Sequence, residues 1–364
     1  MICEAIMTLH RSALHDLIPD GAMEERYGWE LPAVFTTASS EYLAAASGTA
    51  VHDISYTGRL HATGADVLDL LNRLSTNKVE DLAPGQGAPT ILTTDSGRIL
   101  DLIHVVNVGD YILIMTSPET QQTTIDWLDK YTIMEELEVE DQTTSEAMLH
   151  LVGPNSRQWL EQTGGVALEG LQPYGVAPAE IAGLAVQVID KPFGGTPGFA
   201  LLLSNQDAPA LWKHLVENGV TAMGAEAYET LRVENAVPAY GTEMGEPYNP
   251  LEAGLIGSID FAKGCYIGQE VIARLDTYQK VQKHLVTLRF SAESTPTQGL
   301  GLVQDGRVVG RVTSFGSIPN DGHINGLGYV RKAAALEGNR LEMESPAEGW
   351  AEITGFSQLF GPGD

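Results

Sequence analysis

Cysteines and basic side chains are both scarce in this 364-residue sequence. The two cysteines, Cys3 and Cys265, are too few for a disulfide framework, and no set of Cys and His has zinc-like spacing. We therefore expect a reducing, cytoplasmic setting and no metal site. Lys and Arg total 21 against 48 Asp and Glu, which gives a formal net charge of -27. Such a surface repels phosphate backbones and anionic lipid, which argues against direct nucleic-acid or membrane partners.

Long apolar runs are missing as well. No stretch reaches the about 18 apolar residues of a membrane span. The start carries Glu4 and lacks both a basic segment and an uninterrupted apolar one, so we expect no secretory signal. What the sequence does have is 43% hydrophobic residues, enough for a sizeable core, and a length that predicts two or three domains.

Two stretches of the sequence repeat one pattern at a nearly constant spacing. Residues 60–66 and 149–155 each have the pattern of a strand end, a Gly turn and an Asp or Asn helix cap. The strand-like stretches 111–115 and 199–203, 88 residues apart, each lead into a helical pattern. This repetition predicts two related α+β halves, at about 50–135 and 145–225. Chance similarity between amphipathic elements is the alternative.

The C-terminal part has a different composition. Short β-rich runs at 284–290, 307–314 and 326–330 are separated by Gly, Asn and Pro turns, which predicts a small β-barrel or sandwich. The predicted organisation is an α+β region at 1–282, in which 226–282 holds most of the unusual residues, and a β domain at 283–364. The last four residues, 361–364, are expected to form a frayed tail.

The segment 263–276 holds the first candidate site. A glycine interrupts the chain there, and 269–275 has the pattern of a short helix. Cys265 lies just before this helix, near Lys263 and Arg274. A thiol near a helix N-terminus and cations can have a lowered pKa, which makes it more nucleophilic. An inert, buried cysteine is the alternative, because that is the commoner state of free cysteines.

Local charge and one upstream pair add to these candidates. Five basic residues fall between positions 263 and 289, against only Glu270 and Asp276. In so acidic a chain this excess predicts an anion site, with salt bridges to acidic surface elsewhere as the alternative. Upstream, Glu234 and Tyr240 could bind a flat heterocycle, because a carboxylate accepts two parallel N–H bonds and an aromatic ring stacks. A surface acid and a core tyrosine are the alternative.

Residues 263–270 read Lys-Gly-Cys-Tyr-Ile-Gly-Gln-Glu and match the K-G-C-[FY]-x-G-Q-E signature of YgfZ-like proteins at all seven defined positions. Over nearly its whole length the chain also resembles the wider glycine-cleavage T-protein (aminomethyltransferase) superfamily. The matching segments include Asp53-Ile54-Ser55, Gly58-Arg59-Leu60, Thr76-Asn77, Ile99-Leu100-Asp101, Leu231-Arg232-Val233-Glu234, Tyr240-Gly241, the run 250–255 and the run 309–314.

The resemblance implies an α+β fold with duplicated halves around a central channel, which holds tetrahydrofolate or a one-carbon-loaded folate, and a C-terminal β-barrel. It implies that Glu234 binds the pterin, that Asp101 lies near the one-carbon centre, and that Cys265 is the functional residue of YgfZ-like members. Together with the patterns above, the catalytic candidates are Cys265 and Asp101. The cofactor-binding candidates are Glu234, Tyr240, Lys263, Gln269 and Arg274.

YgfZ-like proteins are associated with assembly or repair of iron–sulfur enzymes, and some with tRNA-thiolation enzymes, which implies iron–sulfur client or assembly proteins as partners. The chain departs from the aminomethyltransferase pattern at Thr57, Pro89, Arg98 and Leu102, the last replacing an acid. These departures favour a folate-dependent, YgfZ-like helper, whereas the retained Asp101 keeps a one-carbon transfer enzyme as the alternative. A folate-binding regulator without chemistry is a third interpretation.

Overall fold

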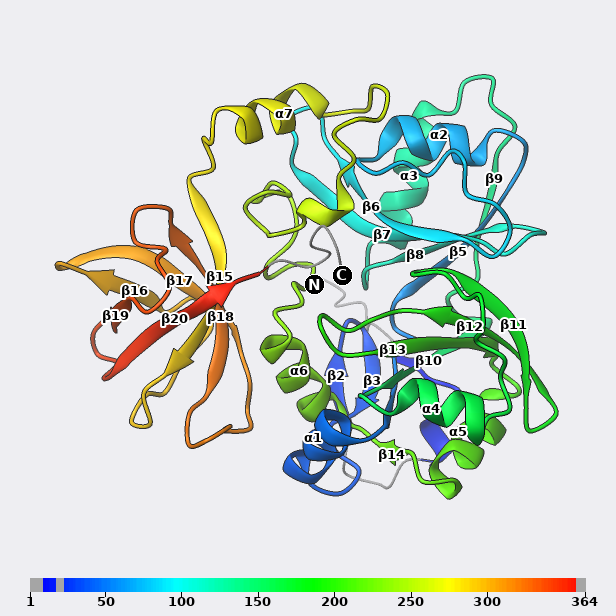
Figure 1. Cartoon of the computed structure of the whole chain (residues 1–364), viewed down its shortest axis with the longest axis horizontal. Coiled ribbons are helices and arrows are strands. Elements are labelled where there is room, and N and C mark those ends of the chain that lie inside the picture. Colours follow the sequence, from blue (N-terminus) through cyan, green and yellow to red (C-terminus); the bar gives the residue numbers. More distant parts are fainter. Residues whose placement is uncertain (1–8, 18–22, 358–364) are drawn as a thin grey trace, which may run out of the picture.

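The structure is a computed structural model that describes residues 9–17 and 23–357. Cys3 and the predicted tail at 361–364 lie outside these residues. Two α+β halves and a closed β-barrel make up most of the molecule, and Figure 1 shows the barrel on one side of the two stacked halves. No helix within the described ranges is long and apolar enough to cross a membrane.

A small sheet, a 3-10 helix and an α-helix precede the halves. The sheet has the order β1-β3-β2, formed by His10–Arg11, Trp29–Pro32 and Met23–Arg26, and the 3-10 helix η1 covers His15–Leu17. Helix α1 spans Ala38–Ser47, and the Thr37 hydroxyl caps it by accepting the backbone N–H of Ser40 at 3.2 Å.

The first half is a five-stranded sheet with two helices and the strand order β6-β7-β8-β5-β9. Its elements are β5 (Gly58–Thr63), α2 (Val67–Leu74), β6 (Gly87–Thr93), β7 (Ile99–Asn107), β8 (Ile112–Thr116), α3 (Gln121–Tyr131) and β9 (Glu138–Asp141). Its apolar core includes Leu60, Leu70 and Ile103, all fully buried.

The second half is a six-stranded sheet of order β11-β12-β13-β10-β4-β14. Its elements are β4 (Ala50–Asp53), β10 (Glu146–Val152), α4 (Ser156–Gln162), β11 (Val176–Ile181), β12 (Leu184–Asp190), β13 (Gly198–Ser204), α5 (Ala208–Glu217) and β14 (Thr221–Ala222). The order β11-β12-β13-β10 repeats β6-β7-β8-β5, so the two halves share the strand order that a duplication requires.

Each half lends one strand to the other half's sheet. Strand β4 leads into β5 along the chain but pairs with β10, and β9 leads into β10 but pairs with β5. The register is equivalent on both sides, because Asp53 faces Leu149 and Asp141 faces Leu60. The exchange makes the two sheets depend on each other.

Arg59 reinforces this union of the halves. It is fully buried, and its guanidinium donates to the carbonyl oxygens of Ser55 at 2.8 Å, Thr57 at 2.5 Å and Thr143. Thr143 follows β9, so the buried cation joins the loop before β5 to the turn between β9 and β10. Carbonyl oxygens accept from both terminal nitrogens of this buried arginine, whereas its Nε has no partner among the described residues.

The remaining elements connect the halves to the barrel. Helix α6 (Ala225–Glu234), the 3-10 helix η2 (Ile256–Ser258) and helix α7 (Gln269–Thr277) lie in the connecting segment. The closed barrel has the order β15-β18-β17-β16-β19-β20, formed by Lys283–Phe290, Asn325–Arg331, Arg307–Phe315, Gly301–Gln304, Arg340–Met343 and Trp350–Phe356. The α+β fold class with a C-terminal β-barrel is therefore confirmed. Because β15 begins at Lys283, we propose the domain limits of 1–282 and 283–364.

Candidate functional site

A pocket opens where the two halves meet α6 and the segment that follows it, and we call it the central pocket. Its cavity volume is about 170 Å³, whereas one water needs roughly 10–15 Å³ on the same measure. The cavity therefore has room for several waters or for a small ligand. The lining combines aromatic and cationic side chains, among them Tyr56, His104, Lys191, Phe193, Tyr228 and Tyr240.

An aromatic stack forms one wall of the central pocket. The ring of Tyr228, on α6, stacks on His52 at 4.1 Å and on Phe193 at 4.6 Å between centroids. Tyr27 stacks on Tyr56 at 5.2 Å, and both line the pocket. Such a wall favours a planar ligand, because aromatic faces attract one another in offset stacks.

His150 fixes the orientation of this wall. Its Nε2 lies 2.9 Å from the carbonyl oxygen of Lys191, which can only accept, so Nε2 carries the proton. Burial lowers the pKa of His150 to about 3, so the ring is neutral and its Nδ1 accepts the Tyr228 hydroxyl at 2.9 Å. The hydroxyl oxygen of Tyr228 therefore keeps its lone pairs for another donor.

Asp101, on β7, lies directly behind the pocket wall and is 1% exposed. Its Oδ2 accepts the backbone N–H of Ser117 at 3.0 Å and the Thr120 hydroxyl at 2.6 Å, whereas no described residue bonds to its buried Oδ1. Burial raises the pKa of Asp101 to about 6, although the hydrogen bonds oppose the rise. Ser117 and the neighbouring Leu102 both line the pocket, so this carboxyl group can exchange a proton near neutral pH beside the cavity.

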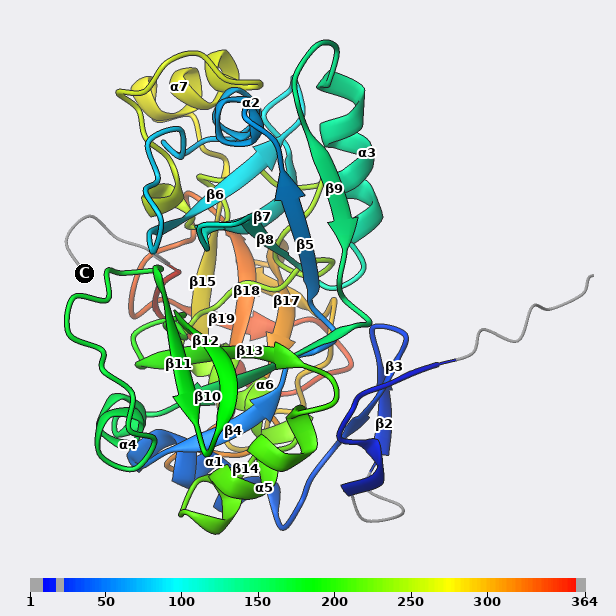
Figure 2. The same cartoon turned by 90° about the vertical axis from the view of Figure 1, so that its right-hand side faces the viewer.

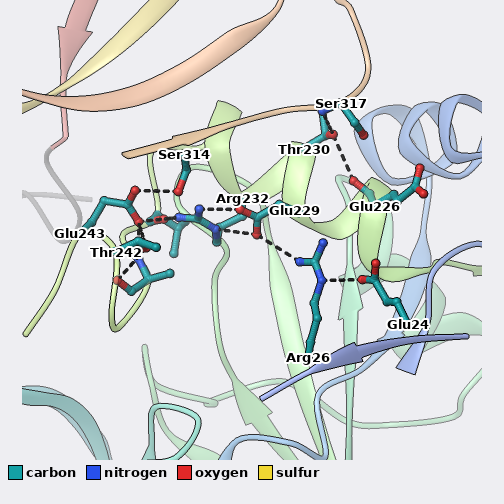
Figure 3. A network of polar contacts seen from close by, with 12 residues as sticks. Glu24, Arg26, Glu226, Glu229, Thr230, Arg232, Thr242, Glu243, Ser314 and Ser317 are labelled. Atoms are coloured by element: carbon teal, nitrogen blue, oxygen red, sulfur yellow. Dashed lines mark hydrogen bonds and ion pairs between the residues drawn. The ribbon is translucent and has the colours of Figure 1, made fainter. Parts of the chain in front are cut away.

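Arg232 contributes a second charged group, which is held in a network (Figure 3). Its Nε and Nη2 donate to Glu229 at 2.9 and 2.6 Å, and its Nη1 donates to Glu243 at 3.1 Å. Arg26 of β2 lies 3.8 Å from Glu229, and Ser314 of β17 donates to Glu243 at 2.7 Å. The network joins the N-terminal sheet to the barrel through α6, and two carboxylates compensate the charge of Arg232.

Lys191, in the turn after β12, is the other cation that lines the pocket. Neither a hydrogen bond nor an ion pair links its ammonium to any described residue. Burial lowers its pKa to about 8, and no acid contributes to the shift.

The structure brings two of the residues expected from the sequence to this pocket. Tyr240 lines it, and Asp101 lies behind its wall. Burial, followed by the charge of Asp101, raises the pKa of Tyr240, so the two groups sense each other. Leu102, which replaces an acid of the aminomethyltransferase pattern, also faces the cavity.

Glu234 lies elsewhere. Its carboxylate accepts the hydroxyl of Tyr42 on α1, and the amides of Asn325 at 2.8 Å and Asn320 at 3.3 Å. It lines a separate pocket between α6 and the barrel, which also contains Arg289. The geometry gives Glu234 a role in joining α1, α6 and the barrel.

The signature segment 263–270 leads into α7, which lies beside α2 of the first half (Figure 1 and Figure 2). Lys263 is directed inward, and its ammonium donates to the carbonyl oxygens of Asn72 at 2.7 Å, Ser75 at 2.8 Å and Asn77 at 2.5 Å. All three of its donors are used, which fixes this loop to the end of α2. Cys265 is exposed and does not line the central pocket.

The other basic residues of this region are dispersed rather than gathered into one anion site. Arg274 is exposed on α7, whose first residue is Gln269. Lys283 lies 4.3 Å above the ring of Tyr248, and Arg289 pairs with Glu352 at 2.9 Å. Within the described residues, no group of three or more His, Cys, Asp or Glu could hold a metal ion.

Sequence reasoning missed the residues that form most of the pocket. Lys191 and Phe193 stand in a turn with no chemical motif, and His150 is one residue within a buried strand. Tyr228 and Arg232 belong to a stretch in which the sequence predicts only Glu234 as a binding residue. One signal was available in the sequence: Tyr228 and Arg232 are four residues apart, a spacing that places both side chains on one face of a helix such as α6.

Comparisons with known proteins agree with this architecture. The family model for the GCVT N-terminal domain matches residues 17–263. A chloroplastic protein of Arabidopsis thaliana, provisionally named a transferase, is 36% identical over 83% of this chain and 70% of its own length. An aminomethyltransferase of Symbiobacterium thermophilum is 30% identical over 92% of this chain and 93% of its own. The glycine cleavage system aminomethyltransferase T from Bartonella henselae has the same fold, with a TM-score of 0.84, 21% identity and coverage of 97% and 98%.

Proposed function

Because this chain belongs to the family of the GCVT N-terminal domain, we propose that it binds a reduced folate and acts in one-carbon transfer. The ligand is tetrahydrofolate or a one-carbon-loaded form of it, held in the central pocket. The observation that carries the proposal is the buried carboxyl group of Asp101, whose Oδ1 has no hydrogen-bond partner among the described residues. The similarity to aminomethyltransferases supports the same assignment.

The chemistry available to Asp101 follows from its surroundings. Ser117 and Thr120 hold Oδ2, so Oδ1 is the oxygen that can meet a ligand. A carboxyl group with a pKa of about 6 can accept a proton from a folate nitrogen or return it at neutral pH. Leu102 supplies no second carboxylate, so in our proposal one acid performs the proton transfer.

The aromatic walls supply the binding surface for a pterin. In our proposal the planar ring lies against the stack that includes Tyr228, and Tyr240 contacts the ligand close to Asp101. This arrangement would exclude water from the reacting end, which strengthens the electrostatic effect of the buried carboxyl group.

Calorimetry with 5-formyltetrahydrofolate, a stable reduced folate, tests the proposal. We expect micromolar binding, and we expect Tyr240→Ala to weaken it about fivefold, because a stacking contact is worth about 1 kcal/mol. Tyr278→Ala is the matched control, since Tyr278 is 64% exposed at the end of α7. If the wild-type protein binds no reduced folate, the proposed function is wrong.

A second candidate function is a folate-dependent helper for iron–sulfur proteins, as in YgfZ-like proteins. The exposed thiol of Cys265 favours this function, and the loop that presents the thiol is held on both sides. Lys263 anchors one side of the loop through three carbonyl oxygens. Gly268 closes the other side with φ +84°, and a Cβ there would lie 2.6 Å from the carbonyl oxygen of Thr94. The expected partners are iron–sulfur client or assembly proteins, in a cytoplasmic setting.

A further inference from the structure

Lys191 gives the central pocket a positive charge that the described part of the protein leaves unpaired. Its ammonium makes no hydrogen bond or ion pair there, although the chain carries a formal charge of -27. The other cation of the lining, Arg232, is held by Glu229 and Glu243. Lys191 is partly buried, and an ammonium partly withdrawn from water gains from a partner of opposite charge, so this arrangement favours an anionic ligand.

The groups around Lys191 do not replace such a ligand. His104 of β7 and His150 of β10 both sense the charge of Lys191: burial, then Lys191 itself, lowers the pKa of each. Neutral imidazoles cannot compensate an ammonium. Phe193 adds an aromatic ring and Tyr228 adds a ring with a neutral hydroxyl, so neither carries a negative charge to match the ammonium.

The position of Lys191 is also fixed. The Lys191 carbonyl accepts the Nε2–H of His150 at 2.9 Å, and its backbone N–H donates to Gly198 at 3.0 Å. The turn that carries the ammonium is thereby held against the aromatic stack, because the same imidazole accepts the hydroxyl of Tyr228. Because the backbone is already held next to the aromatic wall, only the lysine side chain is left to order when a ligand binds, which lowers the entropic cost.

We propose that Lys191 is a carboxylate-binding residue of the central pocket, so that the pocket takes a ligand, or pair of ligands, combining a planar ring with a carboxylate. This inference rests on the proposed folate function. It adds a second contact, between a carboxylate and Lys191, to the contact between the ring and the aromatic wall. The carboxylate can come from two sources: the acidic tail of the folate, or a separate small amino acid that meets the folate in the pocket.

Three probes separate these sources. 5-Formyltetrahydrofolate carries the ring and the acidic tail, 6-methyltetrahydropterin carries the ring alone, and glycine is a small carboxylate. Lys191→Met removes the charge at similar length, Lys191→Arg keeps it, and Lys213→Met is a matched control at an exposed lysine of α5. Affinities are measured by calorimetry, with glycine added to folate-loaded protein.

If the tail is the source, Lys191→Met lowers the affinity for 5-formyltetrahydrofolate about 10- to 100-fold and leaves 6-methyltetrahydropterin unchanged. If a small amino acid is the source, both pterin affinities stay unchanged and glycine binding is lost. Lys191→Arg and Lys213→Met retain binding in either case. Equal affinities of Lys191→Met and wild type for all three probes, or equal weakening of both pterins, would overturn the inference.

Acylation of the wild-type protein provides a measurement that needs no variant. Acetic anhydride modifies accessible amines, and mass spectrometry compares Lys191 with Lys213. Saturating 5-formyltetrahydrofolate or glycine should protect Lys191 and leave Lys213 unprotected. With 6-methyltetrahydropterin, which has no carboxylate, Lys191 should be modified to the same extent as in the free protein. A wild-type protein that binds neither pterin contradicts the proposed function itself, whereas normal pterin binding without protection of Lys191 by any carboxylate contradicts only this inference.

Discussion

Thr120 Oγ1 donates a 2.6 Å hydrogen bond to Oδ2 of Asp101, which leaves Oδ1 as the carboxylate oxygen with no partner among the described residues. Burial raises the pKa of Asp101 to about 6 and outweighs the hydrogen bonds from Ser117, Thr120 and the Leu102 backbone, which stabilise the ionised form. The folded protein therefore holds a carboxyl group whose ionisation it disfavours. Such a group lowers the stability of the folded protein, and carboxyl groups with strongly shifted pKa values are concentrated at functional sites.

Asp101→Asn should stabilise the folded protein at neutral pH and have little such effect at about pH 4. The folded pKa of about 6 exceeds the ordinary value of 3.8, so the wild type loses stability as the pH rises from about 4 to about 6. At about 1.4 kcal/mol per pKa unit the loss is about 3 kcal/mol, which the amide avoids. Urea unfolding of variant and wild type at pH 4 and pH 8 checks this. The same difference at both pH values would contradict it.

Thr120→Val should raise the pKa of Asp101 further. The substitution keeps the shape of the side chain and removes the donor to Oδ2, so the ionised carboxylate loses stabilisation. The acidic limb of folate-dependent activity should move to higher pH by about one unit. Thr120→Ser keeps the hydroxyl and should leave the limb in place. An unchanged pH profile for Thr120→Val would show that Asp101 does not set this limb.

Glu234→Gln should leave folate affinity within about a factor of two of wild type. Its carboxylate bonds to Tyr42 and to two asparagines near the barrel, outside the central pocket. We instead expect a loss of about 1 kcal/mol in the free energy of unfolding, because hydrogen bonds to a charged acceptor weaken. Calorimetry and urea unfolding measure the two effects. A tenfold loss of folate affinity at unchanged stability would restore Glu234 as a pterin ligand.

Gly153→Ala should strongly destabilise the protein, as should Gly64→Ala. The two glycines hold equivalent places, with φ values of +127° and +124°, and a Cβ would lie 2.3 Å from the Gly48 carbonyl oxygen or 1.9 Å from that of Glu136. Gly183→Ala is the control, because Gly183 also has a positive φ but no atom within 4 Å. We expect each clashing variant to lose about 2 kcal/mol or more beyond the control in thermal or urea unfolding.

The equivalence of Gly64 and Gly153 could be predicted from the sequence, because a tight turn before a helix leaves a local signal. The exchange of β4 and β9 could not, since each strand pairs with a partner about 80 to 100 residues away and no local pattern specifies that choice. The resemblance to aminomethyltransferases identified Asp101. Its unpartnered oxygen depends on the positions of Ser117 and Thr120, which only the folded chain shows.

Lys263 and Lys191 show that a sequence motif does not determine whether a lysine reaches the pocket. Lys263 stands in a specific motif and was expected to contact the cofactor, yet the fold directs its ammonium to three backbone carbonyls at the end of α2. Lys191 has no motif, yet the fold places it in the central pocket. Whether a lysine binds backbone or ligand depends on tertiary neighbours, which a pattern of residue types does not contain.

The last prediction separates the two candidate functions by comparing Asp101→Asn with Cys265→Ser. If one-carbon transfer is the function, Asp101→Asn should abolish transfer, because the amide cannot exchange a proton with a folate nitrogen, while folate still binds. Cys265→Ser should then be mild, since its thiol is exposed and does not line the central pocket.

If the helper function holds, the order reverses: Cys265→Ser should abolish rescue of iron–sulfur enzyme activity in a deficient strain, and Asp101→Asn should rescue nearly as well as wild type. Both variants nearly preserve side-chain volume, so both should fold normally. Immunoblots that show equal protein levels check this. Full rescue by Cys265→Ser would exclude the helper function, and undiminished transfer by Asp101→Asn would exclude the enzyme.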